Sequence, residues 1–200
     1  MTAGKHWKLT IEDQRNMVDQ LRFEVCKGWH YFHIFYMLDR VYYPVQHPKN
    51  VFFFSGAASA CKYSTLLVIA RLLDPQEKLS LKGFRRELGL MLPALAPDLQ
   101  TAITNDLDQL IMLLGESSSI EAQIRRLRNN QIAHLSMDYI RDPGAFVSDP
   151  PVNMAEVRRF FHDTLDLLNS IAQHLGMDAV SLEEISDATI RDTQSVLDRL

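Results

Sequence analysis

The sequence has few of the features that mark specialised classes of protein. Only two cysteines, Cys26 and Cys61, occur in 200 residues, and both stand in apolar runs, so we expect buried free thiols. The start of the chain lacks the apolar stretch of a signal peptide. The most apolar run, around LLVIARLL, is shorter than the roughly 18 residues that a membrane-spanning helix needs. We therefore expect a cytoplasmic protein.

An excess of charge of one sign is also missing. The formal net charge is −4, with 23% charged and 46% hydrophobic residues, which is an ordinary globular composition. No global basic field argues for nucleic acid, so any such binding must come from local patches. The length predicts one domain, residues 1–180, followed by an acidic helix or tail at residues 181–200.

Alternation of apolar and polar residues with a period of two, the pattern of strands, is nearly absent, and no internal repeat occurs. Helix caps are frequent instead, in the pairs Thr10 with Asp13, Ser118 with Glu121, Asn153 with Glu156, and Ser181 with Glu184. These signals predict helices near residues 11–44, 50–74, 80–91, 98–114, 121–141, 153–176 and 181–200. The second of these mixes aromatic and small residues in VFFFSGAASACKYS, which predicts a seam where another helix approaches closely. We expect an all-α bundle.

Most known motifs for chemistry are absent as well. The chain has no Gly-rich phosphate loop, no Walker motif, no G-x-S-x-G and no Glu-x-x-His, and the last absence argues against a di-iron bundle. His30 and His33 form a His-x-x-His pair, but only Cys26 stands at helical spacing from it. We interpret both histidines as packed members of an aromatic stripe, and His162 and His174 as surface or boundary residues. We expect no metal and no cofactor.

One polar stretch, RNNQIAHLSMDY at residues 128–139, interrupts a helical pattern. Asn129 and Asn130 are adjacent inside the expected helix, where asparagine competes for backbone hydrogen bonds. The basic residues of this helix cluster just before and within the stretch, at Arg125, Arg126 and Arg128. Such a patch on an acidic chain suits an anion, although a solvated face explains it equally well. His134, in apolar surroundings, can also be an ordinary residue at the edge of the core.

The run RNNQIAH resembles the Arg-x(4–6)-His motif of the HEPN superfamily (higher eukaryote and prokaryote nucleotide-binding domains). Upstream, FFFSGAASACKYSTLLVIARLLDPQEKLSLKGFRREL is similar to the second and third helices of the AbiU-type abortive-infection branch, and the likeness covers roughly residues 10–175. This resemblance implies a HEPN-like up-and-down helical bundle with extra helices. Many HEPN proteins resemble toxins that cut RNA without a metal, whereas others bind nucleotides or partner proteins without cleavage.

The resemblance also implies roles for single residues. Arg128 takes the place of the motif arginine as phosphate clamp, Asn129 the polar position, and His134 the motif histidine as general acid and base. The residues that we expect to bind RNA or its phosphates are Arg125, Arg126, Asn130, Lys82, Arg85 and Arg86. HEPN toxins that a nucleotidyltransferase antitoxin silences carry a modified tyrosine two residues after the histidine. Ser136 stands there instead, and the nearest tyrosine is Tyr139, which puts such control in doubt.

Helix geometry separates Arg128 from His134, so Arg128 must reach round the helix with its long side chain, the helix must be locally distorted, or a second chain must complete the site. Six residues turn through about 600°, which leaves Arg128 and His134 about 120° apart around the axis and about 9 Å apart along it. One chain also offers one suitable histidine, whereas RNA cleavage needs an acid and a base. We therefore predict a homodimeric, metal-independent endoribonuclease, with RNA as substrate and a nucleotidyltransferase-like antitoxin as candidate partner. The alternatives are a non-catalytic HEPN module that binds a nucleotide or a partner protein, and a structural helical bundle.

Overall fold

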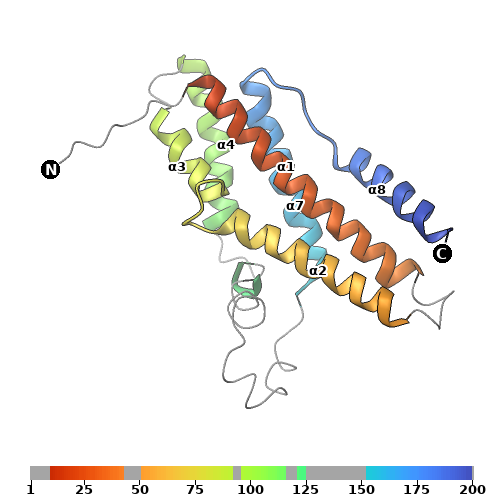
Figure 1. Cartoon of the computed structure of the whole chain (residues 1–200). Coiled ribbons are helices and arrows are strands. Elements are labelled where there is room, and N and C mark those ends of the chain that lie inside the picture. Colours follow the sequence, from red (N-terminus) through yellow and green to blue (C-terminus); the bar gives the residue numbers. More distant parts are fainter. Residues whose placement is uncertain (1–9, 43–50, 92–95, 116–120, 125–151, 200) are drawn as a thin grey trace, which may run out of the picture.

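The computed structural model describes residues 10–42, 51–91, 96–115, 121–124 and 152–199, and most of these residues are helical and none lies in a strand. The expected all-α helical bundle is confirmed. The elements are α1 Ile11–Tyr36, the π-helical η1 Met37–Tyr42, α2 Val51–Leu73, α3 Leu81–Met91, α4 Pro97–Gly115, α7 Met154–His174 and α8 Leu182–Leu197 (Figure 1).

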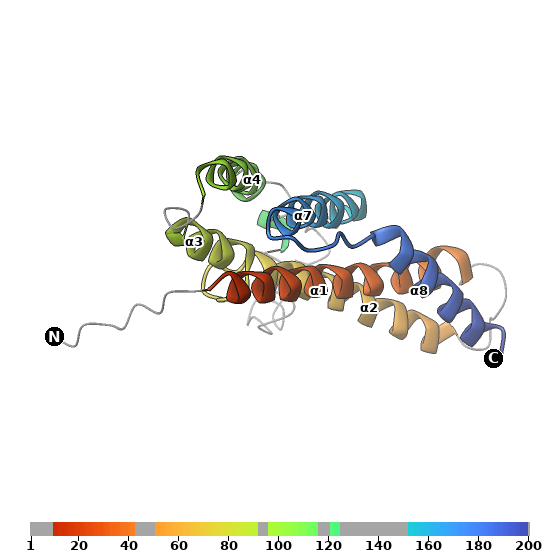
Figure 2. The same ribbon diagram turned by 90° about the horizontal axis from the view of Figure 1, so that it is seen from above.

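The long helix α1 organises the bundle. The helix α2 runs antiparallel along it, and α8 lies along its C-terminal half, while α4 and α7 form a second layer (Figures 1 and 2). The helix α3 packs against α1, α2 and α4 at the other end. The division at residue 180 stays a prediction, although α8 is a helix that packs directly on α1.

The helices begin where the local capping signals predict. At the start of α1, Asp13 N donates to Thr10 Oγ1 at 3.1 Å and Thr10 N donates to Asp13 Oδ2 at 2.7 Å, which completes a capping box. The side chains of Asn153 and Ser181 cap α7 and α8 by accepting single hydrogen bonds, from Ala155 N at 3.0 Å and from Glu184 N at 3.3 Å. After α7 the chain turns at Gly176, whose φ of 71° lies in the region that favours glycine. The predicted capping box at Ser118 lies outside the described residues.

The close approach of helices occurs at a different glycine from the one that the sequence indicates. A Cβ atom added to Gly28 of α1 would lie 2.6 Å from the Phe161 ring of α7 and 2.8 Å from Val68 of α2. Gly28 is therefore the point at which α1, α2 and α7 meet. By contrast, Gly56 and Ala60 are exposed, and a Cβ atom on Gly56 would meet nothing within 4 Å. Within the same stretch, Phe54 and Ala58 are buried in a cluster with Leu38 of η1, so the predicted seam is covered on that side and exposed at Gly56 and Ala60.

The apolar stretch of α2 is longer than the run of fewer than about 18 residues that we expected from the sequence. The 21 residues Phe53–Leu73 are long and apolar enough to cross a membrane, by length and composition only. Core helices pass the same test, and α2 contributes Leu66, Ile69 and Leu72 to the core with no exposed surface. This stretch is thus weak support for a membrane span.

The two cysteines are free but only half-buried, so the expectation of buried thiols is met in part. Burial raises the pKa of the Cys26 thiol to about 11 and also raises the pKa of Cys61. Both side chains are therefore protonated, weakly reactive thiols at neutral pH.

Candidate functional site

The predicted motif lies outside the described residues. This applies to Arg125, Arg126, Arg128, Asn129, Asn130 and His134, and also to Ser136 and Tyr139. Their roles stay predictions. The structure does describe the chain on both sides of them, at residues 121–124 and 152–155, and so locates the place where the motif segment joins the bundle.

Both ends of the motif segment are attached at one place. Before it, Ile124 is buried in the core with 3% of its surface exposed. After it, the backbone N–H of Asn153 donates to Gln123 Oε1 at 3.3 Å, which links the two ends. Lys82 of α3 pairs with Glu121 at 3.0 Å and fixes the first end to a neighbouring helix. The motif segment therefore leaves and rejoins the bundle between α3 and the N-terminus of α7.

The basic residues predicted on α3 differ in how free they are. Lys82 is held by Glu121, and Arg86 lies 3.5 Å from Glu87, so carboxylates neutralise two of the three cations. Arg85 is exposed and makes no ion pair with a described residue. Whether these residues bind RNA stays a prediction, but Lys82 has a structural role beside the motif segment.

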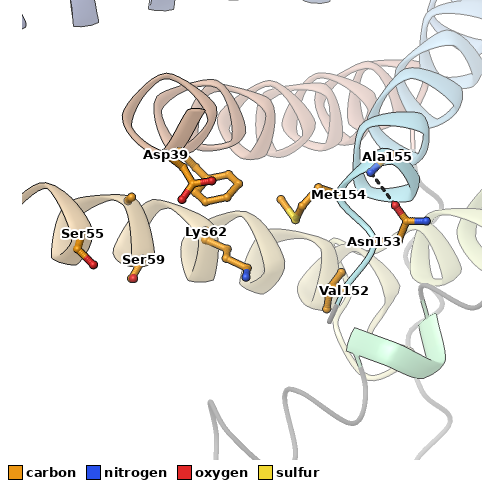
Figure 3. Close-up of a pocket in the computed structure, with 10 residues that line it drawn as sticks. Asp39, Ser55, Ser59, Lys62, Val152, Asn153, Met154 and Ala155 are labelled. Atoms are coloured by element: carbon orange, nitrogen blue, oxygen red, sulfur yellow. Dashed lines mark hydrogen bonds between the residues drawn. The ribbon is translucent and has the colours of Figure 1, made fainter. Parts of the chain in front are cut away.

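A pocket of about 650 Å³ opens beside the end of the motif segment. It lies between the C-terminal part of α1, the middle of α2 and the start of α7 (Figure 3). Its polar lining consists of Asp39, Ser55, Ser59, Lys62 and Asn153, and Phe35, Ala58, Val152, Met154 and Ala155 complete it. Since Val152 and Asn153 are the first described residues after the motif, the pocket is next to the predicted site in the chain.

A second pocket of about 500 Å³ adjoins the first one. The two share Phe35, Met154 and Ala155, so they form one surface, which we call the α1–α7 groove. The remaining lining of the second pocket is Phe32, His33, Tyr36 and Arg158. The groove therefore offers aromatic side chains at one end and hydroxyl, amide and ammonium groups at the other.

The charges of the groove favour an anion. Lys62 and Arg158 make no ion pair with a described residue, and α7 directs the positive end of its dipole towards the groove. Asp39 contributes one carboxylate to the same lining. The sequence analysis missed both cations, although a signal exists: neither has an acidic residue three or four positions away, whereas the neighbouring Arg159 pairs with Asp163 at i,i+4.

Trp29 and the two histidines of α1 attach α8 to the bundle. Trp29 Nε1 donates to the Leu182 carbonyl at 3.1 Å and to Ser186 Oγ at 2.8 Å, and His33 Nε2 lies 3.1 Å from the same hydroxyl. His30 Nδ1 lies 2.8 Å from Thr189 Oγ1. The rings of His33 and His162 pack edge-on against Trp29, with centroids 4.6 and 4.9 Å from its centroid. The interpretation of His30 and His33 as packed histidines is confirmed, and His162 is a partly exposed boundary residue, as expected. His174, at the boundary, pairs with Asp106 at 3.1 Å.

Acid should weaken the contact between α1 and α8, which we call the α1–α8 junction. Burial, with smaller contributions from Arg158, His162 and His30, lowers the pKa of His33. An unfolded chain protonates its histidines near pH 6.5, so below about this pH it binds more protons than the folded protein. We expect the free energy of unfolding to fall as the pH decreases from about 6.5 towards 5. Urea unfolding at several pH values checks this.

The controls are substitutions of single histidines. The His33→Gln variant should show a weaker pH dependence than the wild type, since the imidazole whose pKa is lowered is gone. The His174→Gln variant should keep it, because His174 lies at another junction and has an acidic partner. Equal slopes in the wild type and His33→Gln would contradict the assignment to His33.

The described residues contain no group of three or more His, Cys, Asp or Glu side chains that could hold a metal ion. They do contain a groove next to the ends of the motif segment, and its cations Lys62 and Arg158 pair with no carboxylate among the described residues. Such an arrangement can hold a phosphate-bearing ligand, since ammonium and guanidinium groups donate hydrogen bonds to its oxygens.

Comparison with known proteins identifies the family. The family model described as AbiU2, a HEPN domain family, matches residues 11–196 of the chain. No curated protein and no solved structure matches it. The match extends beyond the stretch that the sequence resemblance covered and includes α8. The chain therefore belongs to the AbiU2 family and is an abortive-infection HEPN domain.

Proposed function

We propose that this protein is a metal-independent endoribonuclease of a bacterial defence or toxin–antitoxin system, with an active site formed across a homodimer. The observation that carries the proposal is the α1–α7 groove, where Lys62 and Arg158 make no ion pair with a described residue, directly beside the ends of the segment that bears RNNQIAH. Membership of an abortive-infection HEPN family supports the same function. A cytoplasmic location and an antitoxin partner belong to this proposal.

The chemistry needs only groups that the chain supplies. The 2′-hydroxyl of the RNA attacks the adjacent phosphate, a base accepts its proton, and an acid protonates the leaving 5′-oxygen. His134 serves in both proton roles, one copy from each chain, because histidine exists in both forms near neutral pH. Arg128 donates two hydrogen bonds to the phosphate oxygens and stabilises the developing charge, and Asn129 orients the phosphate or the histidine.

The groove positions the rest of the substrate. The RNA backbone on one side of the cleaved bond lies along Lys62 and Arg158, with further phosphates at Arg125, Arg126 and Asn130 and at the α3 residues Lys82, Arg85 and Arg86. An unstacked base fits between the aromatic side chains of the second pocket, where Phe35 and Tyr36 offer ring faces. The test is cleavage of an RNA pool in excess EDTA by the wild type and by a His134→Ala variant.

A second candidate function is a non-catalytic module that binds a nucleotide or a partner protein. The second pocket favours it, because Phe32, Phe35 and Tyr36 lie beside the guanidinium of Arg158, which suits an aromatic ligand with an anionic group. Such a module shows saturable ligand binding without cleavage. A purely structural bundle, the third candidate, shows neither.

Charge reversal in the groove should weaken RNA binding. In a Lys62→Glu, Arg158→Glu variant we expect lower affinity for single-stranded RNA, because two cations that contact phosphates become anions. Each lost contact should also reduce the slope of log affinity against log salt by about 0.7. Fluorescence anisotropy at several salt concentrations measures both quantities, and the His134→Ala background prevents cleavage during the titration.

Arg159 provides the matched control, since it neighbours Arg158 but is 82% exposed and pairs with Asp163. The Arg159→Glu variant should bind RNA almost as the wild type does. An equal loss in both variants would mean that only net charge matters. Binding that is insensitive to salt would contradict the RNA groove and favour the small-ligand module.

A further inference from the structure

His33 takes part in two neighbouring features of the structure. Its side chain lines the second pocket together with Phe32, Tyr36 and Arg158. At the same time, its Nε2 atom lies 3.1 Å from Ser186 Oγ of α8. This histidine therefore connects the α1–α7 groove, where we expect the ligand to bind, with the α1–α8 junction.

The hydrogen bonds of Ser186 determine which nitrogen of His33 carries the proton. Ser186 Oγ donates its single proton to the Leu182 carbonyl at 2.8 Å and accepts from Trp29 Nε1 at 2.8 Å. Because the hydroxyl has no second proton, His33 Nε2 is the donor in the contact with Oγ. The neutral ring then has its free lone pair on Nδ1, which makes no hydrogen bond with a described residue. His33 can thus take up a proton on Nδ1 and keep its bond to α8.

The charged groups around His33 oppose this proton. Burial lowers the pKa of His33 most, and the charges of Arg158, His162 and His30 lower it further. Arg158 and His162 stand four residues apart on α7, so they act from the same face of that helix. An anion bound at Arg158 would offset the largest of the three charge effects. Binding of an anion should therefore raise the pKa of His33.

The neighbouring carboxylates face other groups. Glu183 of α8 accepts a hydrogen bond from Ser181 Oγ at 2.9 Å, and it interacts with His162. Asp39 lines the adjoining pocket, together with Lys62 of α2. The described residues that line the second pocket include no carboxylate. An anion that enters this pocket therefore meets Arg158 and His33 without a competing acidic side chain in the described lining.

We propose that Arg158 and His33 form a proton-linked phosphate subsite in the second pocket, in which His33 Nδ1 takes up a proton from the solvent when a phosphate group binds beside Arg158. The protonated ring adds a donor and a positive charge to those of the guanidinium, and both attract the phosphate oxygens. The inference rests on the proposed function for the phosphate nature of the ligand. It adds that the groove binds this ligand more tightly in mild acid.

The phosphate can come from two sources, the backbone of RNA or the end of a nucleotide. A backbone phosphodiester keeps one negative charge throughout the pH range of interest, whereas a terminal phosphate changes its charge near pH 6. A 2′-O-methyl-oligouridine is therefore the main probe, and it has no free 2′-hydroxyl that could attack the backbone. Uridine 5′-monophosphate is the probe for the second source.

Isothermal titration calorimetry in two buffers with different ionisation enthalpies counts the protons taken up on binding. The wild type should take up protons with the oligouridine. Its Kd should decrease at least about threefold from pH 8 to pH 6, since one linked proton allows up to about tenfold per pH unit. His33→Gln keeps a donor for Ser186 but should take up less than about half as many protons. His174→Gln, which lies outside both pockets, should behave as the wild type does.

A measurement without ligand tests the pair of Arg158 and His33 on its own. Arg158 opposes the proton on His33, so its removal should make acid less destabilising. In Arg158→Gln the free energy of unfolding should fall less than in the wild type between about pH 6.5 and pH 5. Arg159→Gln is the matched control, because Arg159 is 82% exposed and pairs with Asp163. An equal fall in the wild type and Arg158→Gln overturns the proposal.

The outcomes of calorimetry separate the subsite from the proposed function. Binding without proton uptake, or with equal uptake in the wild type and His33→Gln, overturns the subsite, while RNA cleavage through His134 can still stand. Proton uptake through His33 in a protein that does not cleave RNA supports the subsite while the proposed function fails. Uptake with uridine 5′-monophosphate but not with the oligouridine supports the subsite and assigns it to a nucleotide. Absence of binding of either probe at pH 6 overturns it.

Discussion

Replacing His134 with alanine should abolish RNA cleavage while the protein stays folded. The substitution removes the proposed acid and the proposed base at once, because both chains of the dimer lose the imidazole. Positioned acid–base catalysis typically contributes about 10²–10⁴ to the rate. Single-turnover cleavage of a mixed RNA pool in excess EDTA measures the loss, and urea unfolding verifies that both proteins are equally stable.

Two arginine variants should separate the phosphate clamp from general charge. Arg128→Lys keeps the positive charge but loses the planar pair of donors, so we expect cleavage to fall severely. Arg125→Ala lies outside the motif and should reduce the rate much less. The products of the wild type should end in a 2′,3′-cyclic phosphate, because the nucleophile belongs to the RNA.

Equal cleavage by the wild type and His134→Ala would contradict the assignment and point to a contaminating nuclease or another site. Absence of cleavage in both, with saturable binding of a nucleotide in the second pocket, would favour the non-catalytic module. The binding would then respond to Arg158→Glu, since that guanidinium lines this pocket.

The limits of most helices follow from the sequence because capping is local. Thr10 and Asp13 satisfy each other's backbone donors within one turn, and the predicted starts at Asn153 and Ser181 are correct for the same reason. The end of α2 near Asp74 is also correct, since proline follows directly. Such signals involve residues at most four positions apart.

The way in which helices meet does not follow from local signals. Small residues at Gly56 and Ala60 indicate a close helix approach, but Gly28 makes it, because only the tertiary structure brings Phe161 and Val68 to that glycine. The α1–α7 groove is of the same kind. Lys62 and Arg158 are nearly a hundred residues apart in the sequence, so no spacing rule indicates that they line one anion-binding site.

The role of α8 likewise depends on long-range contacts. Its acidic composition predicts a helix or tail exposed to solvent. In the structure, however, α8 packs on α1, and the hydroxyl groups of α8 form polar contacts between the two helices. Ser186 and Thr189, with a spacing of three, accept and share hydrogen bonds with Trp29, His33 and His30. The His-x-x-His pair therefore has a partner at matching helical spacing on another helix, which explains it without a metal.

Trp29 is the residue on which this junction most depends. Its side chain is 2% exposed, stacks on Phe32 with centroids 5.2 Å apart, and meets Phe161 edge-on at 6.1 Å. Its indole N–H also bonds the first turn of α8, at Leu182 and Ser186. One side chain thus fills space between α1 and α7 and attaches α8.

Replacing Trp29 with alanine should destabilise the protein by about 3–5 kcal/mol, the usual range for truncating a buried aromatic residue. Part of the loss should be local, because α8 loses the N–H donor that attaches it. Urea unfolding measures the free energy, and limited proteolysis should show faster cleavage within residues 182–197. Trp29→Phe is the matched control: it keeps most of the packing and loses the hydrogen bond, which is worth about 0.5–1.5 kcal/mol. If Trp29→Ala unfolds with the wild-type midpoint, or if proteolysis of α8 is unchanged, Trp29 does not attach α8.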